Sequence, residues 1–198
     1  MPDTSPSSSH ERSEQRRRSR DRRRAVPGPQ KIQAELRLAQ RLWQLAPYQR
    51  AQHVSIYFAI DGELSLEAFI AGAERRHKRL YAPVLRGDSL RFAALRRGVP
   101  LERNRFGILE PPGGPYIDPR SLDLVLTPLA AFDDQGIRLG MGGGVYDRCF
   151  RFLRCRSAWW KPKLIGVGYE CQHLASIDAE EWDVRLWCAV TEADTYYF

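Results

Sequence analysis

The stretch that organises this chain runs from residue 138 to residue 148 and reads Arg-Leu-Gly-Met-Gly-Gly-Gly-Val-Tyr-Asp-Arg. Four glycines fall within five positions, and Tyr146, Asp147 and Arg148 close the stretch. Because glycine lacks a Cβ, its backbone can take left-handed angles and approach a ligand closely. Residues 145–153 are predicted to form a helix, and N–H groups that enter a helix favour anions. The stretch therefore predicts a loop that holds a nucleotide triphosphate.

Strands and helices alternate around this loop. Residues 122–127 read Leu-Asp-Leu-Val-Leu-Thr and predict a buried strand that ends at Pro128. Further apolar runs predict strands at 53–59, 79–83, 90–95, 163–169 and 186–190. Helices are predicted at 11–24, at 30–46 with Pro47 ending or bending it, at 66–76 and at 144–155, and residues 96–120 are predicted to be loop. This order predicts a three-layer α/β/α fold, Rossmann-like and mostly parallel, whose ligands bind beyond the carboxyl ends of the strands.

The positive charge is concentrated at the amino terminus. The chain has 198 residues and a formal net charge of +7, and residues 1–24 hold eight arginines and four acidic residues. Residues 1–10 are predicted to be a disordered tail, and residues 11–198 one domain that includes the arginine-rich helix 11–24. Clustered arginine is typical of nucleic-acid binding, but this segment lacks interleaved aromatic residues. A helix that carries a few arginines into a nucleotide site explains the segment equally well.

Cysteine usage and hydropathy indicate a cytoplasmic protein. The four cysteines, Cys149, Cys155, Cys171 and Cys188, form no Cys-x-x-Cys pair, so the sequence indicates neither a zinc site nor a disulfide framework. The first residues lack an apolar segment, and no window reaches the roughly 20 apolar residues of a membrane span. We expect a cytoplasmic monomer without membrane contact.

The glycine loop matches neither of the two common phosphate motifs. No Lys-Ser or Lys-Thr follows the glycines, and the loop does not follow the first strand, as the dinucleotide fingerprint requires. A flexible surface turn would also account for four glycines. The loop's closing residues favour a functional site, because Asp147 beside a bound phosphate requires a bridging cation such as Mg²⁺. Arg138 and Arg148 would supply forked donors for phosphate.

Two further carboxylates have both a functional and a simple interpretation. Glu63 follows the turn at Asp61-Gly62, beyond a predicted strand, where a substrate-orienting carboxylate would lie. From the sequence alone, an exposed turn acid is the simpler interpretation of Glu63. Asp183 is likewise explained as part of a solvated acidic face. Three aromatic residues lie in predicted strands, and at least two of them are predicted to be core residues: Tyr57, Phe58 and Phe92.

Several segments carry a resemblance when taken in order. They are Ile-Tyr-Phe at 56–58 with Gly-Glu at 62–63, Tyr-Ala-Pro-Val at 81–84, Phe-Gly-Ile-Leu-Glu-Pro at 106–111, Leu-Asp-Leu-Val-Leu-Thr-Pro at 122–128 with Ala-Phe-Asp at 131–133, the stretch 138–148, Gly-Val-Gly-Tyr at 166–169 with Gln172, Glu-Trp-Asp at 181–183 and Val-Thr-Glu at 190–192. Together they resemble the 5-formyltetrahydrofolate cyclo-ligase family, also called 5,10-methenyltetrahydrofolate synthetases. The resemblance covers most of residues 12–193, and its strength lies in the shared order and spacing of the segments.

The resemblance implies a carbon–nitrogen ligase of folate one-carbon metabolism that requires ATP and Mg²⁺. The formyl oxygen of 5-formyltetrahydrofolate takes the γ-phosphoryl group of ATP, N10 closes onto the activated carbon, and phosphate leaves to give 5,10-methenyltetrahydrofolate. This chemistry needs mainly positioning and charge stabilisation, and no covalent nucleophile.

The resemblance also implies a role for individual residues. It implies ATP binding at Arg12, Arg16, Arg138, Leu139, Gly140, Met141, Gly142, Gly143, Gly144, Val145 and Tyr146. It implies folate binding at Phe58, Glu63, Met141, Gly142, Gly143, Gly144 and Val145. It implies Mg²⁺ at Asp147 and Asp183, and catalytic roles for Tyr146 and Arg148.

Two positions depart from the family pattern. Arg12 stands where the family has a lysine, and the two side chains are not equivalent in geometry or hydration. Val145 stands where the family often has an aromatic residue, so a stacking contact would be lost. Two minority alternatives are a folate- or nucleotide-binding protein without turnover and a nucleic-acid-binding protein.

Overall fold

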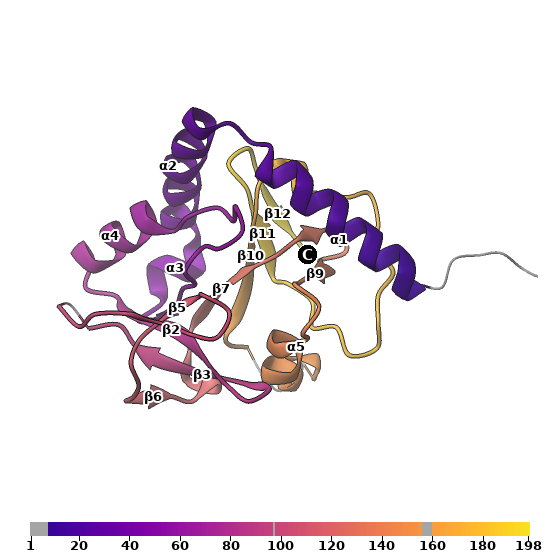
Figure 1. Ribbon diagram of the computed structural model, residues 1–198. Helices are drawn as coiled ribbons and strands as arrows, with labels where there is room; N and C mark the ends of the chain where they lie inside the picture. The colour runs from indigo at the N-terminus through magenta and orange to yellow at the C-terminus, as the bar shows by residue number, and fades with distance from the viewer. Residues whose placement is uncertain (1–7, 97, 156–159) are drawn as a thin grey trace, which may run out of the picture.

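One mixed β-sheet forms the centre of the computed structural model in Figure 1, which describes residues 8–96, 98–155 and 160–198. Its eight strands lie in the order β12-β11-β10-β7-β1-β2-β3-β6. In chain order they are β1 (His53–Ser55), β2 (Arg79–Arg86), β3 (Ser89–Ala94), β6 (Tyr116–Ile117), β7 (Leu124–Pro128), β10 (Lys163–Val167), β11 (Cys188–Val190) and β12 (Thr195–Tyr197).

The inner strands are parallel and the outer strands reverse direction. β1 pairs in parallel with β2 and β7, and β10 pairs in parallel with β7 and β11. β3 and β12 run antiparallel to β2 and β11, and β6 runs antiparallel to β3. The reversal between β2 and β3 uses Gly87, whose φ of +58° suits a tight turn. The predicted α/β fold with a mostly parallel sheet is confirmed.

The helices follow the predicted order with three differences. They are α1 (Ser8–Arg24), α2 (Gly28–Gln44), α3 (Ala46–Arg50), α4 (Glu67–Arg75) and α5 (Val145–Phe150), with 3₁₀ turns η1 (Pro119–Ser121), η2 (Arg151–Arg154) and η3 (Glu170–Gln172). α1 begins at Ser8, so the last three residues of the predicted tail are helical. Pro47 starts the short α3, because proline fits the first turn of a helix but not its interior. The helix predicted at 144–155 divides into α5 and η2.

Several short strands were not predicted. β4 (Glu102–Arg103) pairs with β5 (Leu109–Glu110), and β8 (Ala131–Phe132) pairs with β9 (Arg138–Leu139). β6 lies in the segment 96–120 that was predicted to be loop, and β12 was missed at the end of the chain. Strands of two or three residues contain too few positions to display a period of two, so the sequence carries no signal for them.

The side chains of β7 alternate between two apolar cores. Leu124 and Leu126 join the core beneath α2, α3 and α4, whereas Val125 joins the core that contains residues of α5 and η2. All three side chains are fully buried. This is the pattern of a parallel strand with helices on both faces, and it agrees with the predicted three layers.

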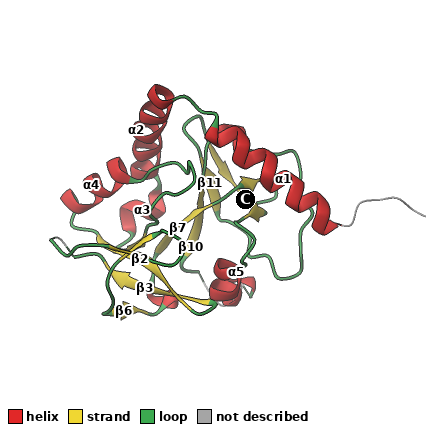
Figure 2. Ribbon diagram, viewed as in Figure 1, coloured by secondary structure: helices red, strands yellow, loops and turns green. Residues whose placement is uncertain are grey.

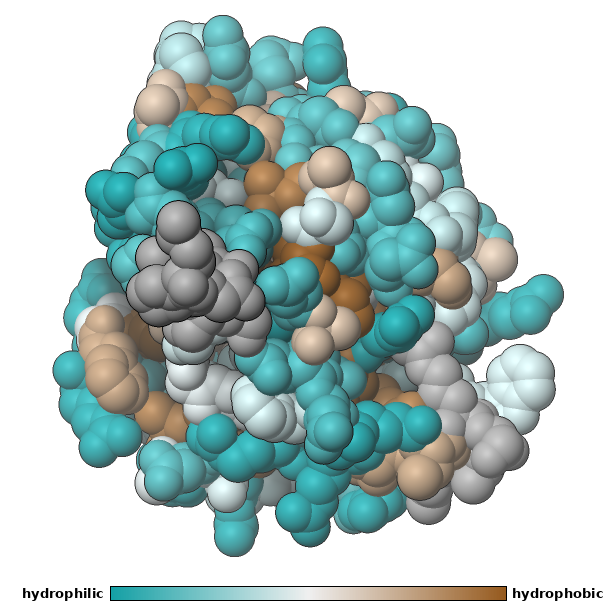
Figure 3. Space-filling view, turned by 90° about the vertical axis from the view of Figure 1, so that its right-hand side faces the viewer, coloured by the Kyte–Doolittle hydropathy of each residue, from teal (hydrophilic) through white to brown (hydrophobic). Residues whose placement is uncertain are grey.

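Helix α1 lies along the carboxyl edge of the sheet (Figures 1 and 2). It contacts η3, which follows β10, and β8, which follows β7. Its outward arginines are exposed: Arg17, Arg18, Arg22 and Arg24. The face seen from the right-hand side of Figure 1 is mostly hydrophilic around a hydrophobic strip (Figure 3). Helix α1 therefore covers the edge at which ligands of such sheets bind.

We expect Gly72→Ala to destabilise the fold by about 1–3 kcal/mol, the usual cost of overpacking. A Cβ on Gly72 would lie 2.2 Å from Cζ2 of Trp43, where α4 packs against α2. The higher helix propensity of alanine, worth about 1 kcal/mol, offsets part of this cost. Urea unfolding measures the difference. Gly28→Ala is the control, because a Cβ on Gly28 meets nothing within 4 Å; equal stability of the two variants would contradict the packing argument.

Candidate active site

A hairpin that follows β7 fixes the start of the glycine loop. The Asp133 carboxylate accepts the N–H groups of Gln135 and Ile137 at 3.0 and 2.9 Å, which holds the turn between β8 and β9. Ile137 and Leu139 are buried in a small apolar cluster beneath the hairpin. The glycine loop therefore leaves a well-anchored element at the carboxyl edge of the sheet.

The glycine loop takes conformations that require glycine. Gly142 and Gly144 have φ values of +100° and +59°, which other residues rarely adopt. The helix that follows, α5, has only six residues, so its dipole adds less to anion binding than the predicted longer helix would. A pocket of about 370 Å³ adjoins the loop. Its lining combines glycine backbone, one carboxylate, cations and an indole: Gly142, Gly143, Gly144, Asp147, Arg148, Arg151, Arg154 and Trp182.

One face of α1 carries inward-facing polar residues at this edge. Arg12, Ser19 and Arg23 are buried and Arg16 is half-buried, at intervals of four, three and four residues that define a single helix face. Within the described parts of the chain, Nε of Arg16 and the hydroxyl of Ser19 are buried without a hydrogen-bond partner. Desolvation lowers the pKa of Arg16, and the neighbouring Arg12 lowers it further. Buried donors of this kind fit an anionic ligand.

The two predicted metal carboxylates lie close together, and each is paired with an arginine. Asp147 Oδ1 accepts Arg138 Nη2 at 2.7 Å and the N–H of Val184 at 3.1 Å. Asp183, the residue before Val184, accepts Arg12 Nη1 at 3.0 Å. The side chain of Asp183 is only 5% exposed, so its interpretation as a solvated acid is wrong.

These carboxylates fit Mg²⁺ only together with a ligand. Across residues 8–96, 98–155 and 160–198, no group of three or more His, Cys, Asp or Glu residues could hold a metal ion. Mg²⁺ commonly binds one or two carboxylates together with substrate phosphates and water, so two acids are sufficient where a bound ligand supplies phosphate. Asp147 lines the glycine pocket directly. Asp183 does not line it, but the next residue, Val184, donates its N–H to Asp147.

Glu63 is a buried carboxyl, and its interpretation as an exposed turn acid is wrong. Asp61 and Gly62 have φ values of +52° and +78°, and the N–H of Glu63 donates to the carbonyl of Ile60 at 2.9 Å, which gives a tight turn. The Glu63 side chain is 5% exposed, and its Oε2 accepts the N–H of Ile60 at 3.1 Å. Desolvation raises the pKa of Glu63 to about 7, against the lowering effect of that hydrogen bond and of Arg23. Glu63 therefore changes charge near neutral pH.

The remaining predicted residues divide between the glycine loop and a second pocket. Burial and the nearby Glu63 raise the pKa of the Tyr146 phenol well above its ordinary value, so the phenol is neutral and can donate. Arg148 is exposed, lines the glycine pocket and donates to the carbonyl of Asp88 at 3.2 Å.

Phe58 lines a different pocket of about 430 Å³, between α4, the end of β3 and the segment 111–114. Tyr57 and Phe92 are core residues, as predicted.

Sequence reasoning missed several residues of this edge. Arg23 is completely buried between α1 and the glycine loop, and Arg151, Arg154 and Trp182 line the glycine pocket. The helical spacing from Arg12 to Arg23 was the available signal for Arg23. It was hidden because arginines occupy nearly every face of α1.

The fold and this edge define a Rossmann-like α/β protein with a phosphate-type glycine loop, paired carboxylates and a buried acid. The chain matches the 5-formyltetrahydrofolate cyclo-ligase family over residues 8–192. It is 36% identical to the 5-formyltetrahydrofolate cyclo-ligase of Haemophilus influenzae over 79% of this chain and 84% of that protein. It is 34% identical to that of Escherichia coli K12 over 89% of this chain and 98% of that protein.

A solved structure agrees with these relatives. The NMR structure of the Aquifex aeolicus 5,10-methenyltetrahydrofolate synthetase matches with a TM-score of 0.81 and 26% identity, over 94% of this chain and 92% of that one. The chain belongs to the 5-formyltetrahydrofolate cyclo-ligase family. It is therefore an ATP-dependent ligase of folate metabolism. None of the helices in the described ranges has the length and apolar character needed to cross a membrane.

Proposed function

We propose that the chain converts 5-formyltetrahydrofolate into 5,10-methenyltetrahydrofolate by phosphorylating the formyl oxygen with ATP. The formyl oxygen attacks the γ-phosphorus, and the bond between that phosphorus and ADP breaks. N10 of the folate then attacks the formyl carbon and loses its proton, and phosphate departs with the formyl oxygen. Such a reaction depends on holding two substrates in contact and on stabilising the charge of the transferred group.

The observation that carries this proposal is the composition of the glycine pocket. Glycine backbone, the Asp147 carboxylate and the Arg148 guanidinium line one pocket of about 370 Å³. A carboxylate beside guanidinium groups suits a phosphate chain that brings its own divalent cation, because the cation removes the repulsion between carboxylate and phosphate. This arrangement favours nucleotide binding over the surface turn that the glycines alone would allow.

The phosphates are assigned to the glycine loop and to arginines that flank it. Arg138 is held by Asp147, and Arg12 and Arg16 come from the inner face of α1. Arg148 is one of three exposed arginines that line the pocket, with Arg151 and Arg154, and it is assigned to the charge that develops on the transferred group. The unpartnered Nε of Arg16 supports this assignment, because a phosphate oxygen would satisfy it.

Asp147 and Asp183 would hold Mg²⁺ together with the phosphates. The ion would neutralise phosphate charge and thereby make the γ-phosphorus easier to attack. The role of the protein is to keep both carboxylates oriented, which Arg138 and Arg12 do through their hydrogen bonds.

The folate is assigned to Glu63 and to the pocket that Phe58 lines. The pterin ring carries N–H donors, which match a buried carboxylate acceptor such as Glu63. The pocket of about 430 Å³ has apolar walls that include Phe58, Ile70 and Leu95, which suit an aromatic ring. Met141 lies 4.0 Å from Arg23, which faces Glu63, and the glycines line the glycine pocket, so the loop is assigned to both ligands.

The titratable groups near the site favour a route in which no intermediate is covalently bound to the enzyme. Burial raises the pKa of Cys149 to about 11, so its thiol is protonated at neutral pH and is a weak nucleophile. The neutral Tyr146 phenol is assigned a donor role at the reacting oxygens.

Turnover tests the proposed function. Purified protein with ATP, Mg²⁺ and 5-formyltetrahydrofolate should accumulate 5,10-methenyltetrahydrofolate, followed by its ultraviolet absorbance, and should release one ADP for each product. Omission of ATP or chelation of Mg²⁺ should stop the reaction. Calorimetric binding of folate or ATP without product at high enzyme concentration would favour the alternative of a binding protein.

We further propose that the protein is cytoplasmic and monomeric. Sedimentation analysis would test the oligomeric state.

A further inference from the structure

Arg23 is the most deeply buried cation of the site, although it lies in an otherwise solvated run of arginines. Its side chain is 0% exposed, whereas the neighbouring Arg24 is 47% exposed and Arg22 is exposed as well. Removing a guanidinium from water costs several kcal/mol unless its donors are paired. The position of Arg23 therefore requires compensating contacts, and these are numerous.

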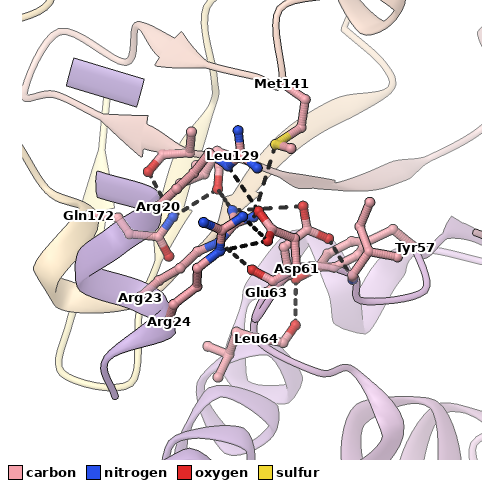
Figure 4. Close-up of polar contacts among 12 residues, drawn as sticks. Arg20, Arg23, Arg24, Tyr57, Asp61, Glu63, Leu64, Leu129, Met141 and Gln172 are labelled. Carbon is pink, nitrogen blue, oxygen red and sulfur yellow. Dashed lines mark hydrogen bonds and ion pairs between the residues drawn. The ribbon is translucent and has the colours of Figure 1, made fainter. Parts of the chain in front are cut away.

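The guanidinium of Arg23 joins three segments of the carboxyl edge (Figure 4). Its Nε donates to the carbonyl of Asp61 at 3.1 Å, and its Nη2 donates to the Asp61 carboxylate at 3.0 Å. Its Nη1 donates to the carbonyl of Leu129 at 3.1 Å and lies 3.8 Å from Oε1 of Glu63. Its Nη2 also lies 4.0 Å from the sulfur of Met141 in the glycine loop. One side chain thus connects the Glu63 turn, the segment after β7 and the glycine loop.

Anchoring of α1 does not by itself account for this arrangement. Arg20 and Arg24 already pair with the Asp61 carboxylate from more exposed positions, with Arg20 Nε at 2.9 Å and Arg24 Nε at 2.7 Å. The feature particular to Arg23 is its reach past Asp61 to Glu63 and Leu129. Leu129 is itself held by Gln172, whose Nε2 donates to the same carbonyl at 2.8 Å.

Charged and titratable groups surround Glu63 from each element that packs against it. They are Arg20 and Arg23 from α1, Asp61 from its own turn, Tyr57 from the segment after β1 and Tyr146 from α5. Of these, Arg23 makes the larger of the two favourable contributions to the charged form of Glu63, ahead of Arg20. The Asp61 carboxylate opposes the charged form of Glu63. Arg23 reduces this repulsion, because it pairs directly with Asp61.

We propose that Arg23 is a positioning residue that holds the Glu63 carboxylate, in its charged form and in one orientation, for the folate beside the glycine loop. This inference rests on the assignment of folate to Glu63 in the proposed function. Its rigid fork is essential, because Nε and Nη2 donate to Asp61 in the turn while Nη1 faces both the Leu129 carbonyl and Glu63. A lysine at this position would keep the charge but not these simultaneous contacts.

The test is the pH dependence of KM for 5-formyltetrahydrofolate at saturating ATP and Mg²⁺, from pH 6 to 9. For the native protein, KM should fall as the pH rises through about 7, where Glu63 ionises. Arg23→Gln loses both the charge and the fork, so it should move this inflection up by about one pH unit and raise KM about 15-fold at pH 7 and about threefold at pH 9. Arg23→Lys should leave the inflection in place and raise KM about threefold at every pH, because only the fork is lost.

Arg24→Gln is the matched control, because Arg24 also pairs with Asp61 but is exposed. It should leave both KM and the inflection unchanged. The same inflection is measured without turnover by the ¹³C chemical shift of the Glu63 carboxyl carbon, assigned with Glu63→Gln. If circular dichroism shows that Arg23→Gln does not fold, Arg23→Lys decides, since an unchanged KM for Arg23→Lys would overturn the proposal.

Two different failures are distinguishable in this experiment. Absence of product from the native protein would overturn the proposed function. An active native protein whose Glu63 titration is the same in Arg23→Gln, with KM raised equally at every pH, would overturn the positioning role. Arg23 would then only anchor α1.

Discussion

Asp147→Asn is expected to lower kcat/KM about 100-fold and to raise the Mg²⁺ concentration needed for half-maximal turnover. Asn is isosteric, so its oxygen can still accept Arg138 Nη2 and the N–H of Val184, which Asp147 accepts at 2.7 and 3.1 Å. The fold and the position of Arg138 should therefore survive. The loss is that of a charged metal ligand, which an amide replaces poorly.

Initial rates over a Mg²⁺ titration at saturating ATP and folate measure this effect. Asp134→Asn is the control, because Asp134 is 63% exposed and pairs with His173 outside the glycine pocket. Its rates and Mg²⁺ requirement should equal those of the native protein. A fall in turnover with an unchanged Mg²⁺ requirement would show that Asp147 acts by orienting Arg138 and would remove it from the metal site.

The central sheet could be predicted because the parallel strands β7, β10 and β11 are mostly apolar on both faces. Runs such as 122–127 have few alternatives to a buried strand. The glycines predicted a backbone with positive φ, which glycine adopts most readily, as the values at Gly142 and Gly144 show. The short strands β4, β5, β6, β8 and β9 could not be predicted, because each has only two residues and is defined by its pairing with another segment rather than by a pattern of its own. Local sequence does not encode such pairing.

The environment of the site residues was harder to predict than their location. Glu63 and Asp183 looked like surface acids, since a carboxylate in a polar turn is usually solvated. They are buried because α1 lies along the carboxyl edge and supplies arginines to both, Arg23 at one end and Arg12 at the other. These residues are eleven positions apart, or about 16 Å along a helix. The helical spacing of the buried arginines is hidden in the sequence, because arginines occupy nearly every face of α1.

Glu63→Gln is expected to raise KM for 5-formyltetrahydrofolate by roughly 10- to 100-fold at pH 8. An increase of this size corresponds to the free energy lost with one charge-assisted hydrogen bond. At pH 6 the difference should be small, because the carboxyl of the native protein is then mostly protonated, given its pKa of about 7. The KM of the variant should not change with pH in this range. Initial rates at pH 6, 7 and 8 measure the effect, and an equal increase at all three would contradict a role for the charged carboxyl.

The same substitution should stabilise the fold at alkaline pH. Burial raises the pKa of Glu63 from 4.5 to about 7, so between these values the folded state retains a proton that the unfolded state has lost. Stability attributable to Glu63 therefore falls as the pH rises from about 4.5 to about 7, and the full cost of the buried charge is present above that range. Gln carries no charge, and its oxygen can still accept the N–H of Ile60.

Urea unfolding should accordingly show Glu63→Gln to be about 2 kcal/mol more stable than the native protein at pH 8, with little difference at pH 5. Glu102→Gln, at an exposed position of β4, should show no such dependence on pH. A variant that binds folate worse while folding better would mean that the buried charge is retained for function at the expense of stability. Equal stability of the two proteins at pH 8 would mean that the surrounding arginines compensate the charge completely, and Glu63 would then not titrate near neutral pH.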